Sequence, residues 1–216
     1  MQNRKQTAWR KSRKFGDRYG GRQRLKLADN IFKREHSLSP PAPGQETPIL
    51  IEDNPSRDFF FPLSGQAILA TLHQLPKEHT SGITHIWLRR IKRSDYEVRK
   101  QPLACFICGS GVRLIVLYPW PQDRILRFEQ GRTKAQLLRE YGRWTTDLFQ
   151  ENGRWCLRWT LESLREFTIF LLLHEVGHHV DWYTRHWSKA NRKQVEEFAE
   201  RYAVEWSAVA TQLTEM

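Results

Sequence analysis

The feature that most constrains this chain is a segment at residues 167–173, apolar apart from one threonine, that leads directly into His174-Glu175-Val176-Gly177-His178. This segment is long enough to bury a helix but far shorter than the roughly 20 apolar residues that span a membrane. The pattern predicts one long helix over residues 161–183. The two histidines of the motif are four residues apart, so we expect their imidazoles on one face of that helix, one turn apart.

Two neutral imidazoles in this arrangement can bind one zinc ion, and we predict His174 and His178 as ligands. Glu175 lies about 100° further round the helix. From there it can reach a water on the metal, so we predict it as the general base. Asp181 is a candidate to hold the His178 imidazole from behind, with an ordinary charge at the helix end as the alternative. His179 is expected at the surface.

A catalytic zinc site usually has three protein ligands and one position for water. A second predicted helix, at residues 192–212, supplies candidates for the third ligand. Its apolar residues form one stripe, which consists of Val195, Phe198, Ala199, Tyr202 and Trp206. Glu196 and Glu200 lie on one border of this stripe, whereas Glu197 lies on another side. We therefore predict Glu196 as third ligand and Glu200 as a partner of a ligand histidine; His186 is the alternative ligand. Gly177 leaves room for another segment to approach the motif helix closely.

The motif His174-Glu175-Val176-Gly177-His178 followed by Glu196-x-x-Ala199-Glu200 resembles the gluzincin metallopeptidases, in which a Glu-x-x-Ser/Ala-Asp segment follows the zinc helix. The short chain and the H-E-x-G-H form are similar to the compact bacterial peptidases of the ImmA/IrrE kind. The resemblance covers about residues 161–206, and Glu200 stands where the group has aspartate. It implies a zincin-like fold and a zinc-dependent peptidase that acts on a peptide or protein. Tyr183, His186 and Tyr202 are candidates to stabilise an oxyanion, and no spacing argument selects one of them.

The rest of the chain predicts an α+β fold, with a small mixed or antiparallel sheet packed on the motif helix and on the helix that bears Glu196. Strands are predicted at residues 83–91, 103–108, 112–118 and 155–160, and helices at residues 64–76 and 133–151. Residues 109–111 are expected to form a hairpin turn. By the same resemblance, strand 112–118 is the expected sheet edge that receives an extended substrate.

The positive charge of the chain is concentrated at its N-terminus. Residues 1–34 contain twelve Lys and Arg and two Asp, a net charge of +10, while the whole chain carries +11. We predict a basic, disordered tail and linker at residues 1–57 and a zincin-like domain at residues 58–216. Residues 1–34 are expected to contact nucleic acid or an acidic partner, or to act only as a solubilising tail.

Composition also indicates a location. The chain has three cysteines and no hydrophobic segment behind its basic N-terminus, which predicts a cytoplasmic protein without a transmembrane segment. The alternative function is a nucleic-acid-associated binding or regulatory protein in which the zinc site is structural or vestigial. An intact Glu175 favours the enzyme, because a structural site does not need a general base.

Overall fold

The computed structural model describes residues 36–97, 103–109, 111–185, 187–188 and 190–211. The predicted basic segment at residues 1–34 and His186 lie outside these described residues. Within the described ranges, no helix is long and apolar enough to cross a membrane.

The main sheet has four strands in the order β1 (Ile49–Glu52), β3 (His85–Leu88), β5 (Val112–Leu117) and β4 (Ala104–Gly109). β1, β3 and β5 are parallel to one another, and β4 pairs antiparallel with β5. The connection from β1 to β3 includes β2 (Phe59–Phe60) and two helices, α3 (Gly65–His73) and α4 (Lys77–Thr80). The predicted α+β class is therefore confirmed, and the sheet is mixed.

The sheet corrects two expectations. Strand 112–118 was predicted at the sheet edge, but β5 lies between β3 and β4, and the edge strands are β1 and β4. A run such as Leu114-Ile115-Val116-Leu117, buried throughout, is typical of a central strand covered on both faces. The linker expected up to residue 57 is also too long, because residues 49–52 form β1 and pair with β3. Three apolar residues after a proline-rich segment are too short a run to be identified without their partner strand.

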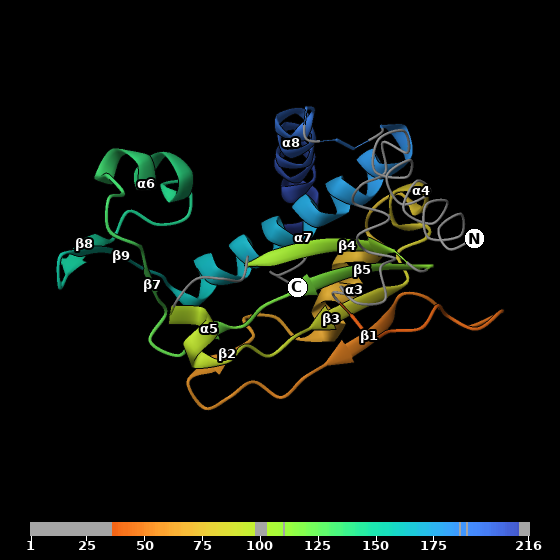
Figure 1. Ribbon diagram of the computed structural model, residues 1–216, viewed down its shortest axis with the longest axis horizontal. Coiled ribbons are helices and arrows are strands. Elements are labelled where there is room, and N and C mark those ends of the chain that lie inside the picture. Colours follow the sequence, from red (N-terminus) through yellow and green to blue (C-terminus); the bar gives the residue numbers. More distant parts are fainter. Residues whose placement is uncertain (1–35, 98–102, 110, 186, 189, 212–216) are drawn as a thin grey trace, which may run out of the picture.

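Two long helices cover one face of this sheet. α7 (Leu161–Thr184) begins at a capping box formed by Thr160 and Ser163, and α8 (Arg192–Thr211) packs across it. Figure 1 shows α7 between the sheet and α8. Consistent with this position, α7 has buried residues around most of its circumference. Gly177 permits the contact with α8, because a Cβ at this position would lie only 2.8 Å from the Cα of Ala199.

A second, smaller unit lies at the N-terminal end of α7 (Figure 1). It consists of the three-stranded antiparallel sheet β7 (Ile125–Arg127), β9 (Arg154–Arg158) and β8 (Leu148–Glu151), together with α6 (Lys134–Tyr141). The helix predicted at residues 133–151 is therefore wrong in its second half. α6 ends at the cap residue Gly142, and Asn152-Gly153, with φ of 51° and 72°, forms the tight turn between β8 and β9.

Three groups of buried side chains hold these layers together. The first fills the space between the main sheet, α3, α7 and α8; the second lies between the smaller unit and the first half of α7. The third covers the other face of the main sheet, close to α5 (Arg93–Glu97) and to the two-stranded pair of β2 and β6 (Trp120–Pro121). The second half of α7, which carries the motif, is thus held between the sheet and α8.

Candidate metal centre

The first half of the candidate site comes from a single turn of α7. His174 and His178 project from the same face, with ring centroids 4.7 Å apart and planes at 89°. The side chain of His178 is 10% exposed and that of His174 is 21% exposed. The two imidazoles therefore converge at a point that is shielded by the helix on one side and open on the other.

The second half comes from α8. Oε2 of Glu196 lies 3.6 Å from Nε2 of His174 and 3.4 Å from Nε2 of His178. One ligand atom from each of these three residues lies within 4.8 Å of the other two, a grouping that could hold a metal ion. The structure thus brings together the three residues that the sequence predicted as ligands.

The two imidazoles stabilise the anionic form of Glu196. The neighbouring His174 and, after it, His178 hold the pKa of the Glu196 carboxyl well below its usual range, against an opposing effect of burial. The carboxylate is therefore anionic at neutral pH, which is the form that binds a metal ion.

Glu175 occupies a different environment from Glu196. It is only 6% exposed, and burial raises its pKa, while the neighbouring imidazoles and a backbone hydrogen bond from Phe106 act in the opposite direction. Burial of the Glu175 carboxyl thus favours its protonated form, while the nearby imidazoles favour the anion.

These residues line one cleft of about 580 Å³. One wall is formed by residues 103–106 at the start of β4, and a second by α6 and the residue Trp144 that follows it. The floor is the face of α7 that carries the motif, and the remaining side is formed by Trp187, Arg192, Glu196 and Glu200. The start of β4, an edge strand of the main sheet, therefore lies beside the candidate metal ligands.

Asp181 does not take the predicted position behind His178. Its fully buried carboxylate accepts a hydrogen bond of 2.8 Å from Nε1 of Trp187, and Nε of Arg185 lies 2.9 Å from its other oxygen. Nδ1 of His178 is buried and has no hydrogen-bond partner among the described residues. Three residues advance the helix by about 300°, which is enough to turn Asp181 toward Trp187. The indole of Trp187 in turn packs edge-on against His178, with centroids 5.4 Å apart.

Of the other predicted site residues, one lines the cleft and one does not. Glu200 is exposed and lines the cleft one turn after Glu196. Tyr183 does not line it; this residue lies beneath the guanidinium of Arg113, 4.6 Å from ring to Cζ, on another side of α7. His186, the alternative ligand and oxyanion candidate, lies outside the described residues.

His179 was expected at the surface but is fully buried. Its Nε2 lies 3.0 Å from the backbone carbonyl of Ser81, directly after α4. Burial lowers the pKa of His179 to about 4, so the neutral ring donates this hydrogen bond. The residue therefore fastens α7 to the segment after α4 and takes no part in the cleft.

Sequence reasoning missed three parts of the cleft. Trp187 and Arg192 follow the motif helix, and no spacing rule connects them to it. Trp144 was placed on the helix predicted at residues 133–151, and no pattern connected it to the motif helix, where its ring packs on Phe170 with centroids 4.9 Å apart. The only available signal was the density of aromatic residues in both segments.

A scan against protein-family models and searches of curated proteins and of solved structures found no match to this chain. The description of the site therefore depends on its geometry.

Proposed function

We propose that this chain is a zincin-like, zinc-dependent metallopeptidase, with His174, His178 and Glu196 as metal ligands and Glu175 as general base. The observation that carries the proposal is the convergence of Glu196 from α8 on both imidazoles of α7. A buried carboxyl beside that point, in an open cleft, adds the group that hydrolysis requires.

The residues present fit a zinc ion. Zinc–nitrogen and zinc–oxygen bonds of about 2.0–2.2 Å in a tetrahedron place the ligand atoms roughly 3.3 Å apart. The observed distances from Oε2 of Glu196 to the two imidazole nitrogens are 3.4 and 3.6 Å. Two histidines and one glutamate are a ligand set of catalytic zinc sites. The Glu196 side chain is 47% exposed, so the site is open on the side of the cleft.

When bound, zinc would supply a polarised water and a Lewis acid for the substrate carbonyl. The residues of the chain supply the rest. The Glu175 carboxylate accepts the proton of the attacking water and passes it to the leaving amine. The backbone hydrogen bond from Phe106 helps to keep this carboxylate in place. Among the described residues no strand pairs with the side of β4 away from β5, where an extended peptide can add as a further strand.

The first experiment replaces Glu175 by Gln. Because the metal ligands are unchanged, the variant should retain zinc, measured by elemental analysis, while the rate of peptide hydrolysis falls about a hundredfold to ten-thousandfold. Glu166→Gln is the matched control, because Glu166 is exposed on the same helix. Equal turnover in the Glu175→Gln protein and the wild type would refute the general-base role, whereas zinc binding without turnover in the wild type would favour the alternative of a structural zinc site.

The second experiment tests the third ligand. Glu196→Ala should weaken zinc binding in a titration against a competing chelator, because it removes the anionic donor. Glu197→Ala is the control, since Glu197 is exposed and pairs with Lys193 at 3.4 Å. Unchanged zinc affinity in Glu196→Ala would point to another ligand, such as His186.

A further inference from the structure

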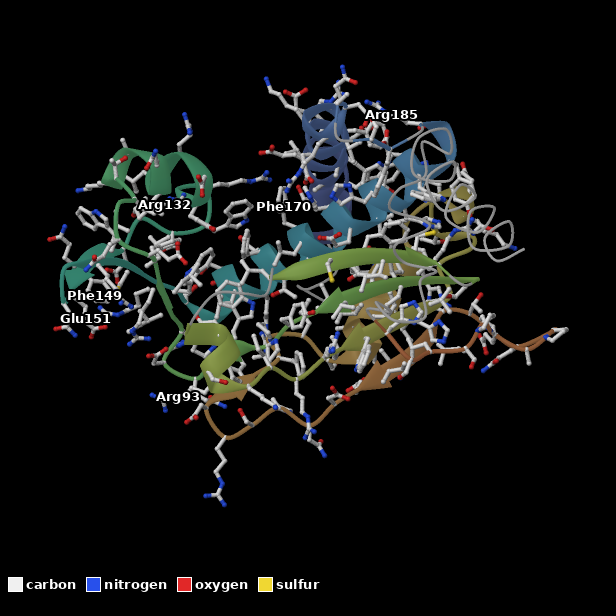
Figure 2. All side chains as sticks on the ribbon, in the orientation of Figure 1. Arg93, Arg132, Phe149, Glu151, Phe170 and Arg185 are labelled. Carbon is white, nitrogen blue, oxygen red and sulfur yellow. The ribbon has the colours of Figure 1, made fainter. Side chains whose placement is uncertain are left out.

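Beside the candidate metal ligands, one side of the cleft is lined by four aromatic residues and a leucine. We define the aromatic wall as Tyr141, Trp144, Phe167, Phe170 and Leu171, all of which line the cleft. The Trp144 ring is the centre of the wall, with centroids 4.6 Å from Phe167 and 4.9 Å from Phe170, both in edge-to-face geometry. Figure 2 labels Phe170, which lies between α6 and α8 in this view.

The helix places this wall next to the reacting position. Phe170 and Leu171 precede His174 by four and three residues on α7, which corresponds to roughly 5–6 Å along the axis. An extended peptide advances about 3.3 Å per residue. A substrate held at the metal ligands would therefore bring the side chain of a residue flanking the cleaved bond to the aromatic wall.

Two rings of the wall, Trp144 and Phe170, differ in exposure from the core behind them. Trp120, Trp159 and Phe128 of the adjoining cluster are fully buried, whereas Trp144 and Phe170 keep part of their surface in the cleft. Apolar rings partly open to a cleft are typical of a binding pocket, because filling the pocket removes this surface from water.

The wall is also held in place before any ligand binds. Arg143 lies over both rings, with Cζ 5.8 Å from Trp144 and 6.0 Å from Phe170, and its guanidinium donates a hydrogen bond of 3.2 Å to Oγ of Ser207 on α8. This bridge joins the smaller unit to α8. A preformed wall loses little conformational entropy when a ligand binds.

The charge on this side of the cleft argues against a charged occupant. Glu140, which also lines the cleft, is already paired with Arg132. A charged side chain would have to give up its water against these rings, and the charged groups beside them are already engaged, Glu140 by Arg132 and the Arg143 guanidinium by Ser207. A bulky apolar side chain gains from the same contact.

We propose that the aromatic wall is the specificity pocket of the cleft and binds a large aromatic or aliphatic side chain that directly flanks the cleaved peptide bond. This inference rests on the proposed peptidase function.

Binding and cleavage are tested separately. Binding is measured by calorimetry with the zinc-loaded Glu175→Gln protein and two capped alanine–serine octapeptides, one with a single central Phe and one without it. We expect the Phe peptide to bind at least about tenfold more tightly. Cleavage is measured with the wild-type protein on a mixed peptide library, with products identified by mass spectrometry. We expect Phe, Tyr, Trp or Leu to be enriched at a position flanking the cleaved bond.

The variant Trp144→Ala should abolish both preferences, and Trp144→Phe should retain part of them. Trp155→Ala is the control for general damage, because Trp155 packs in the same cluster without lining the cleft. Cleavage without apolar enrichment would overturn the pocket while leaving the peptidase intact. Preferential binding of the Phe peptide without cleavage would support the pocket and refute the peptidase. An equal loss of preference in Trp155→Ala would overturn the assignment to Trp144.

Discussion

Gly177→Ala is the sharpest test of how the site is assembled. The added Cβ would lie 2.8 Å from the Cα of Ala199 and 3.0 Å from the Cβ of Tyr202. Carbon atoms in contact are normally about 3.5–4.0 Å apart. The Ala199 atom belongs to the backbone and cannot rotate away, so α7 and α8 must separate by roughly 1 Å.

Two opposing effects decide the change in stability. Overpacking costs about 1–3 kcal/mol, whereas replacing glycine by alanine inside a helix contributes about 1 kcal/mol in the other direction. We therefore expect the free energy of unfolding to fall by up to about 2 kcal/mol. The effect on the metal should be larger, because Glu196 lies one turn before Ala199 on α8 and moves with it. Metal ligands tolerate only small changes in distance, so zinc affinity should fall at least about tenfold.

Urea unfolding of the zinc-free protein measures the first effect, and a zinc titration against a chelator measures the second. Glu166→Ala, an exposed replacement on the same helix, controls for helix propensity. A Gly177→Ala protein that is more stable by about 1 kcal/mol and binds zinc normally would show only the propensity effect. That result would refute the close contact between α7 and α8.

Three further predictions concern the surroundings of the site. Asp181→Ala should lower the unfolding free energy by about 1–3 kcal/mol, because the Trp187 indole loses its acceptor; Asp181→Asn should recover part of this in urea unfolding, and no recovery would argue against the hydrogen bond. The pKa of His179 is lowered from 6.5 to about 4, so the unfolded chain binds a proton that the folded chain does not, and the stability of the zinc-free protein should fall as pH drops through that window. His179→Gln should remove this component from the measured pH profile, and an unchanged profile would contradict the burial argument. Tyr202→Phe should cost about 1 kcal/mol by removing the bond to His79 without changing turnover, whereas a large loss of turnover would give Tyr202 a direct role.

The candidate ligands could be predicted because the relevant information is local. Two histidines four residues apart share a helix face in any context, and the apolar segment before them fixes the helix. The position of Glu196 followed from the same periodicity, because the apolar stripe of α8 determines which of its carboxylates faces α7. The distances in the structure agree with that reasoning.

The strand order, the aromatic wall and the burial of His179 could not be predicted, because they depend on contacts between segments far apart in the sequence. The order of strands cannot be obtained from their separate patterns, so the central strand β5 was taken for the edge and β1 was missed. The aromatic wall required knowing that Trp144 packs on Phe170. His179 is polar, so the sequence alone predicts it at the surface. It is buried because the segment after α4 packs over it and its ring bonds to the carbonyl of Ser81.

Gly177 belongs to the motif on α7 and also contacts α8, so it connects the motif with the helix that carries the third candidate ligand. It lies between His174 and His178, and the residue it contacts, Ala199, lies one turn after Glu196. A close contact between the two helices therefore falls at the level of the candidate metal ligands. A side chain at this position would push α8 away and move Glu196 away from the two imidazoles. A glycine before the second histidine thus indicates that another helix packs directly against the motif. The third ligand is then expected on that helix.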